Sequence, residues 1–459
     1  MDSAKSRNPQ SGGPPIEQAK QKRATMIKAT ENSNREKTNY YIGIFSIFLF
    51  LNCIFYRDFS YLSIGENIYI TELFIGLSLI GLSISFLNTI KTKNLNTQKI
   101  IALWAIFFIW GTSLLLADNN SEIIFKIREY AAIYYSLFFL FTTMLINTEK
   151  SSNKALKTII IAAFISVIYV IARFALGLGN ITTTDMVYRY GNYELVGILV
   201  LYAYTLCRFL QGSDNKTTNI AIIGLSIFVV NFLITHRSGS LAMVATTLVI
   251  LFFFGKNKSA FNKAGIFIFL GVAGIAAVML AAPEFGGKAI SRITGVFDSS
   301  IYEDPNASWR LKVWMHAISS MSFIEVIFGV GWGYNVPVLN FSGRDYAVDG
   351  FIGIHNSIVY YFLHIGATGV IIFLTLVYKI YADAIRAIQR SRTDKSKVIL
   401  VTLLSSNFGI LFFAMFNVVL EGPYMSIVFW TTLGLLFNYT RIQSNARIQL
   451  GKTTNFSHE

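Results

Sequence analysis

The strongest constraint on the fold of this 459-residue chain is a series of apolar runs, each long enough to cross a lipid bilayer. A membrane-spanning helix needs about 17–25 mostly apolar residues. Only 14% of the residues are charged and 53% are hydrophobic, whereas soluble domains carry about 25% charged residues. Because a backbone inside lipid must satisfy its own hydrogen bonds, the sequence predicts an all-α polytopic membrane protein.

We expect about twelve transmembrane helices, at 39–55, 68–88, 99–116, 130–147, 155–177, 193–210, 217–234, 238–254, 264–282, 356–380, 398–420 and 423–439. The predicted domains are a disordered basic tail over 1–38, one transmembrane domain over 39–440 and a C-terminal tail over 441–459. The one long loop, 283–355, is expected to be functional and to contain interfacial helices, including one over 306–321.

The positions of lysine and arginine predict the orientation in the membrane. Basic clusters occur in the N-terminal tail and around residues 91–93, 256–258 and 386–397. All of them lie on the cytoplasmic side if the N-terminus is cytoplasmic. Both termini and the tails are then inside, and the 283–355 loop is periplasmic. We therefore interpret the net charge of +14 as a topology signal and not as nucleic-acid binding.

The stretch HNSIVYYFLHIGATG (355–369) places a histidine at the outward end of the tenth predicted span. The positive end of a helix lowers the pKa of a histidine, so His355 is expected to be neutral and able to accept a proton. Helical geometry brings Gly366 and Gly369 back to within about 40° of His355, where they allow a neighbouring helix to pack closely. His364 points the other way and is expected to be structural.

Arginines form the second group of candidates, because a guanidinium pairs well with phosphate oxygens. Arg237 and Ser238 lie in the tight outer turn before the eighth span, at another outward helix N-terminus. Arg310 lies on the predicted loop helix, and Arg189 precedes the sixth span. The alternative for Arg237 and Arg310 is an arginine that only extends to the lipid headgroups.

Together, these residues suit a diphosphate leaving group and a hydroxyl nucleophile. The arginines would offset the charge that develops on the diphosphate, and neutral His355 would take the proton of the acceptor. This chemistry requires no cofactor. The five histidines are scattered without ligand spacing, so we predict no metal site.

The chain resembles the bacterial O-antigen ligase/polymerase superfamily of membrane glycosyltransferases. The resemblance covers roughly 185–370, and its main motif is His-Asn, nine residues, Gly, two residues, Gly. The residues that match this motif are His355, Asn356, Gly366 and Gly369. Three further features are similar: Arg237 in a short outer turn, Arg310 ahead of Trp314 in the long loop, and the glycine cluster Gly329, Gly331 and Gly333 downstream of Trp314.

The resemblance implies a metal-independent, inverting transfer of a glycan from undecaprenyl diphosphate at the periplasmic face of the bacterial inner membrane. It implies that His355 is the base and that Arg237 and Arg310 bind the diphosphate. Arg189, Ser238, Asn356 and Trp314 are expected to bind substrate. The favoured acceptor is a sugar of lipid A–core, as in an O-antigen ligase of lipopolysaccharide biosynthesis. A second lipid-linked glycan, as in a repeat-unit polymerase, is the alternative.

Two further hypotheses remain open from the sequence. A transporter for a lipid-linked sugar would need charged or broken helices near the bilayer midplane. A peptidoglycan polymerase of a related fold would use an outer-loop aspartate, for which Asp345 and Asp349 are the candidates.

Overall fold

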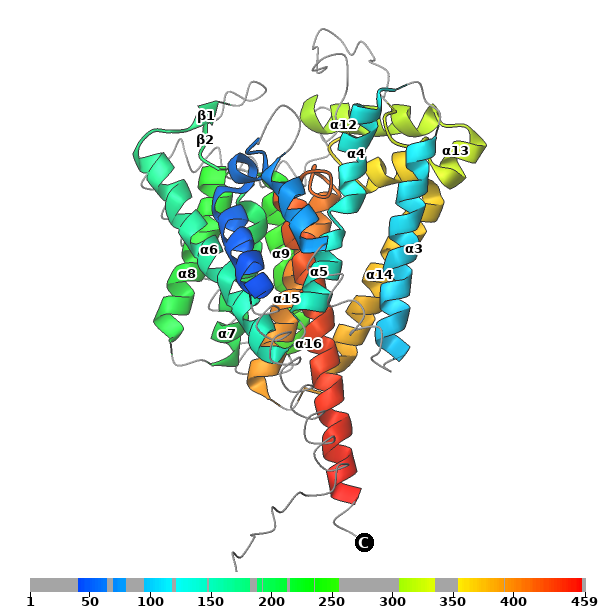
Figure 1. Cartoon of the computed structure of the whole chain (residues 1–459). Coiled ribbons are helices and arrows are strands. Elements are labelled where there is room, and N and C mark those ends of the chain that lie inside the picture. The colour runs from blue at the N-terminus through cyan, green and yellow to red at the C-terminus, as the bar shows by residue number, and fades with distance from the viewer. Residues whose placement is uncertain are drawn as a thin grey trace, which may run out of the picture.

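The computed structural model describes residues 40–63, 69–79, 95–117, 121–146, 148–181, 188–191, 193–212, 215–234, 236–255, 305–334, 354–391 and 393–455. This part of the chain is nearly all helical, as expected, and it contains one short β-hairpin (Figure 1). Its first helices are Tyr40–Ser60 and Ile70–Leu79. The remaining elements are α3 (Leu95–Ser113), η1 (Leu114–Leu116), α4 (Ile123–Tyr134), α5 (Leu137–Leu145), α6 (Glu149–Ala175), β1 (Asn180–Ile181), β2 (Tyr188–Arg189), α7 (Leu195–Gln211), α8 (Lys216–Phe228), η2 (Val229–Ile234), α9 (Arg237–Phe254), α12 (Pro305–Ser319), α13 (Phe323–Phe328), α14 (Ser357–Gln389), α15 (Asp394–Ala414) and α16 (Pro423–Asn455).

Seven helices in the described ranges are long and apolar enough to cross a membrane: Tyr40–Ser60, Thr97–Leu116, Glu149–Ala175, Lys216–Ile234, Arg237–Phe254, Ser357–Gln389 and Asp394–Ala414. The predicted run 130–147 is divided into α4 and α5, and the predicted run 264–282 lies outside the described residues. The total of twelve therefore stays a prediction. α16 continues to Asn455, well past the expected end of its span, and Figure 1 shows its last turns projecting from the bundle.

α15 lies at the centre of the bundle, where it packs against α7, α9, α14 and α16. Its buried Asn407 donates from Nδ2 to Phe429 O at 2.9 Å and to Thr432 Oγ1 at 2.8 Å. Tyr381 Oη donates in turn to Asn407 Oδ1 at 2.7 Å. This single amide links α14, α15 and α16, because buried polar groups in an apolar bundle need partners on neighbouring helices.

α14 is interrupted at Gly366, which has φ 67° and ψ −179°. The expectation that Gly366 and Gly369 lie on one continuous helical stripe is therefore wrong. The break leaves some carbonyl groups of α14 without N–H donors from the helix itself, and other segments of the chain supply the donors instead. Val330 N donates to Leu363 O, Gly331 N to His364 O and Trp110 Nε1 to Ile365 O. The close approach at Gly366 is made by the end of α13, since a Cβ there would collide with Gly329 N and Ile327 O.

The helix expected over 306–321 is present as α12, whose buried side chains are Trp309, Val313 and Ala317. Figure 1 shows α12, α13 and α4 gathered at one end of the bundle, opposite the projecting end of α16. α13 packs against α14, so this part of the predicted outer loop is joined to a long helix.

Candidate active site

The connection between α15 and α16, which we call the 415–422 loop, joins the segments that carry the predicted site. Ser357, the first residue of α14, contacts this loop through four hydrogen bonds. Its Oγ donates to Glu421 Oε2 at 2.6 Å and to Asn417 O at 3.1 Å, and it accepts from Val419 N at 3.0 Å and Leu420 N at 3.1 Å. Ser357 is fully buried, so the loop has a fixed position relative to the start of α14.

Arg310 on α12 reaches the same loop. Its Nη1 donates to Phe416 O at 2.8 Å. Arg310 also lies close enough to His355 for its charge to act on the pKa of that side chain. Two of the three predicted catalytic residues are thus brought together, although they are 45 positions apart in the sequence.

His355 has a left-handed backbone conformation, with φ 49°. This conformation is uncommon outside glycine, and strained residues of this kind cluster at functional sites. The following residue holds it in place, because Asn356 Oδ1 accepts from Ile358 N at 2.9 Å and Val359 N at 3.0 Å as the N-cap of α14. The oxygen of Asn356 is therefore used for capping, and its contact with substrate stays a prediction.

The ring of His355 lies edge-on to Trp309, with the ring centroids 5.6 Å apart. Burial and the charge of Arg310 lower the pKa of His355 to about 4. The side chain is therefore neutral at neutral pH, in the direction expected from the sequence. The main cause is burial rather than the helix end. Trp309 was missed in the sequence analysis, although it directly precedes Arg310.

Trp314 was expected to bind substrate. In the structure its Nε1 donates to Ile354 O at 2.7 Å, one residue before His355. This bond fixes the backbone that enters the site, so Trp314 positions His355 whatever else it contacts.

The N-terminus of α9 approaches the same loop from another side. Ser238 Oγ accepts from Asn417 Nδ2 at 2.6 Å and lies 3.0 Å from His236 Nδ1. Ser238 is buried, whereas Arg237 is exposed. The α9 start is thus connected through Asn417 to Ser357, and the segment that carries Arg237 joins the segments that carry Arg310 and His355.

Glu421, in the 415–422 loop, is an acidic residue that was not among the predicted site residues. Burial raises its pKa to about 7, against the opposing effect of its hydrogen bond from Ser357 and of nearby backbone N–H groups. The only sequence signal for it is an acid between two apolar runs, before a Gly-Pro pair. Glu421 thus adds a second titratable group to the site, because it accepts from Ser357, the residue two positions after His355.

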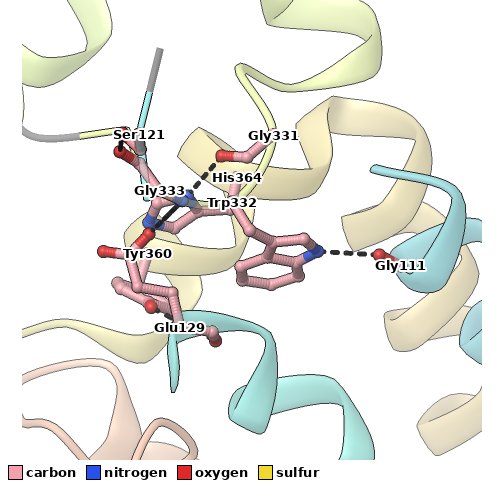
Figure 2. Close-up of polar contacts among 8 residues, drawn as sticks. All are labelled: Gly111, Ser121, Glu129, Gly331, Trp332, Gly333, Tyr360 and His364. Carbon is pink, nitrogen blue, oxygen red and sulfur yellow. Dashed lines mark hydrogen bonds and ion pairs between the residues drawn. The ribbon is translucent and has the colours of Figure 1, made fainter. Parts of the chain in front are cut away.

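His364 lies away from this centre, as expected. Figure 2 shows its ring against that of Trp332, which belongs to the glycine-rich turn 329–333. The two ring centroids are 5.0 Å apart. His364 Nδ1 donates to Gly331 O at 2.8 Å and lies 3.8 Å from Glu129 Oε2. Glu129 accepts from Gly333 N at 2.6 Å, and Trp332 Nε1 donates to Gly111 O at 2.7 Å. These contacts fix the turn against α3, α4 and α14.

For Arg189 the structure describes only the backbone, which pairs in β2 with Asn180 of β1. The role of Arg189 stays a prediction. Asp345 and Asp349 lie outside the described residues.

Comparison with known proteins agrees with the resemblance seen in the sequence. Residues 221–374 match the family model described as O-antigen ligase. No curated protein matches the chain. A chain in the solved structure described as "Structural coordination of polymerization and crosslinking by a peptidoglycan synthase complex" is similar with 15% identity and a TM-score of 0.44, over 75% of this chain and 98% of that one. Residues 221–374 of this multi-pass helical chain are thus similar to the O-antigen ligase family, which supports a relation to the O-antigen ligase/polymerase superfamily.

Proposed function

We propose that this protein is an O-antigen ligase-type glycosyltransferase that moves a glycan from undecaprenyl diphosphate to a sugar hydroxyl of lipid A–core at the periplasmic face of the inner membrane. The observation that carries the proposal is the convergence on the 415–422 loop. Arg310 bonds Phe416 O, Ser238 bonds Asn417, and Ser357 bonds Glu421. The match of residues 221–374 to the O-antigen ligase family model supports the same class of chemistry.

In the proposed step, the acceptor oxygen attacks the anomeric carbon of the donor, opposite the diphosphate. The bond between that carbon and the diphosphate oxygen breaks, and the diphosphate leaves with the electron pair. His355 takes the proton of the acceptor hydroxyl. Arg310 and Arg237 stabilise the charge on the departing diphosphate, so the reaction needs no metal ion.

The low pKa of His355 implies that the donor must bind before His355 can take the proton of the acceptor. Without substrate, burial and Arg310 hold the pKa at about 4, which makes the imidazole a weak proton acceptor. A bound diphosphate adds negative charge beside Arg310, which offsets the guanidinium and raises the pKa of His355. His355 then becomes a better base only when the donor is in place.

Reconstitution of the purified protein with a lipid-linked repeat unit tests the proposal. We expect a product only when lipid A–core is added. Chain extension without lipid A–core would instead identify a repeat-unit polymerase. Appearance of the unchanged lipid-linked glycan on the opposite side of the vesicle would identify a transporter.

Substitutions test the assigned residues in the same assay. We expect His355→Ala to lower the rate by roughly 10²–10⁴-fold and Arg310→Ala by roughly 10²–10³-fold, with normal amounts of protein in the membrane. Arg386→Ala is the matched control, because Arg386 is exposed and pairs with Asp383 far along α14. Wild-type rates in both site variants would refute the assignment.

A further inference from the structure

An arginine and three tyrosines form a second cluster beside the candidate site, which we call the Arg57 cluster. Arg57 Nη1 donates to Tyr193 Oη at 3.0 Å, and its guanidinium carbon lies 5.7 Å from the Tyr193 ring and 5.9 Å from the Tyr61 ring. Both rings contact Tyr424, with centroids at 4.6 Å for Tyr193 and 5.8 Å for Tyr61. The four residues come from three separate parts of the chain, so the fold creates the cluster.

A buried polar network holds the cluster in place. Asn52 Nδ2 donates to Tyr424 O at 3.2 Å, and Ser60 Oγ donates to Asn52 Oδ1 at 2.6 Å. Thr71 Oγ1 donates to Ser60 O at 3.0 Å. Asn52, Ser60 and Thr71 are all fully buried. The first helix, the start of the second and the start of α16 are therefore joined directly behind the tyrosines, and the rings are preorganised rather than loosely packed.

The cluster adjoins the candidate active site through the 415–422 loop. Tyr424 follows Glu421 by three residues, and Glu421 accepts from Ser357 beside His355. Ser426 N donates to Gly422 O, which continues the start of α16 into the loop. The Arg57 cluster is therefore connected to the start of α14, next to His355, through the 415–422 loop and Ser357.

The Arg57 cluster is accessible to a ligand and carries a positive charge. Arg57 is exposed, and 38% of the surface of Tyr61 is accessible. In the part of the chain that the structure describes, the ion pairs are His364–Glu129 and Arg386–Asp383. Within that part, the positive charge of Arg57 has tyrosines around it but no carboxylate. An arginine framed by aromatic rings at an opening offers N–H donors together with flat apolar faces.

This combination matches the chemistry of a sugar. One face of a pyranose ring carries C–H groups with partial positive charge, which meet the negative face of an aromatic ring. Its hydroxyl groups accept hydrogen bonds from a guanidinium, which has five N–H donors. We propose that Arg57, Tyr61 and Tyr193 form a sugar-binding subsite for the glycan of the transfer reaction, which rests on the function proposed above.

Binding of two lipids to the full-length protein in phosphatidylcholine nanodiscs tests the subsite. The probes are undecaprenyl diphosphate and the same lipid carrying one glucose, and the measured quantity is the ratio of their dissociation constants. We expect the wild type to bind the glycosylated lipid roughly three- to tenfold more tightly. In Tyr61→Ala and in Arg57→Ala the ratio should fall to near one, with the affinity for undecaprenyl diphosphate unchanged.

Three variants separate a ring contact from other roles. Tyr61→Phe keeps the aromatic face and should keep most of the ratio. Tyr378→Ala and Arg386→Ala remove an exposed tyrosine and an exposed arginine from α14, which contributes no residue to the cluster. Both variants should leave the ratio of dissociation constants unchanged. Equal losses of affinity for both lipids in Arg57→Ala would show that Arg57 binds phosphate groups, and this would overturn the subsite.

A wild-type ratio of one would also overturn the subsite, as would an unchanged ratio in Tyr61→Ala and Arg57→Ala. The transfer assay gives a separate answer. If the ratio behaves as expected but the purified protein transfers no glycan, the proposed function fails and the sugar subsite stands. Competition with free oligosaccharides from the donor and from the acceptor then shows which glycan occupies it.

Discussion

At the scale of single residues, the candidate site contains two groups whose contributions to stability depend on pH in opposite directions. The pKa of His355 is lowered from 6.5 to about 4, and the pKa of Glu421 is raised from 4.5 to about 7. Both shifts arise mainly from burial, which disfavours the charged form of each group. A shift of one unit corresponds to about 1.4 kcal/mol, so each shift is linked to up to about 3 kcal/mol of stability.

The signs of the two effects follow from the unfolded state. Neutral His355 contributes stability above pH 6.5, and this contribution is lost as the pH falls toward 4. Protonated Glu421 contributes stability below pH 4.5, and this contribution is lost as the pH rises through 7. The two contributions oppose each other between about pH 4.5 and 6.5.

We therefore expect each single variant to reveal the effect of the other group. In Glu421→Gln, the melting temperature should fall steeply from pH 6.5 to 4.5. In His355→Gln, it should fall from pH 4.5 to 7, relative to the double variant. Thermal unfolding in nanodiscs at several pH values measures both trends. Parallel profiles for the two single variants would contradict the assigned pKa shifts.

At the scale of elements, the break in α14 is the main difference between expectation and structure. The spacing of Gly366 and Gly369 from His355 fits a continuous helix, and nothing in the sequence alone shows that α13 packs into this position. The structure uses Gly366 for a backbone conformation, with φ 67° and ψ −179°, that is essentially restricted to glycine. The donors of Val330, Gly331 and Trp110 then replace the missing helical bonds.

Gly366→Ala should therefore destabilise the protein by about 3 kcal/mol or more, since the change adds backbone strain to a collision with the α13 end. Gly224→Ala in α8 is the matched control, because a Cβ there meets nothing within 4 Å. We expect the control to keep its melting temperature or gain slightly, as alanine favours a helix. Similar melting temperatures for both variants would show that the break is not required.

The packing of the elements also explains which residues of the candidate site could be predicted from the sequence and which could not. His355, Arg310 and Arg237 were predicted because each is an ionisable group expected near the outer membrane surface, and their roles stay predictions. Trp309 and Glu421 were missed, since their importance depends on which distant segments pack together. Ser357 is the clearest example. A serine at the start of a helix is ordinary in sequence, but here it bonds four groups of the 415–422 loop.

At the scale of the whole molecule, the helical class followed from composition and from the apolar runs. The fold then depends on polar contacts that no periodicity shows, such as Asn407 between α14, α15 and α16. Another is Asn438, whose Nδ2 donates to Thr142 O and Ile146 O at the end of α5. These contacts join helices that are far apart in sequence, so sequence patterns define the helices but not their neighbours.

The predicted orientation can be tested on the whole molecule by cysteine labelling. Cys53 and Cys207 are buried, so a membrane-impermeant maleimide should not react with the wild type. Ser319→Cys, on the exposed end of α12, should react in intact spheroplasts. Lys395→Cys, in the exposed first turn of α15, should react only after lysis. The reverse pattern would invert the topology and place the candidate site in the cytoplasm.

The 415–422 loop also sets the order in which the protein can mature. Arg237, Arg310 and His355 leave the ribosome before the loop that bonds their segments, because they precede it in the sequence. A nascent chain therefore carries the motif residues without the framework that orients them. Addition of the 415–422 loop joins these segments, so a chain that stops before it lacks the contacts to Arg310, Ser238 and Ser357.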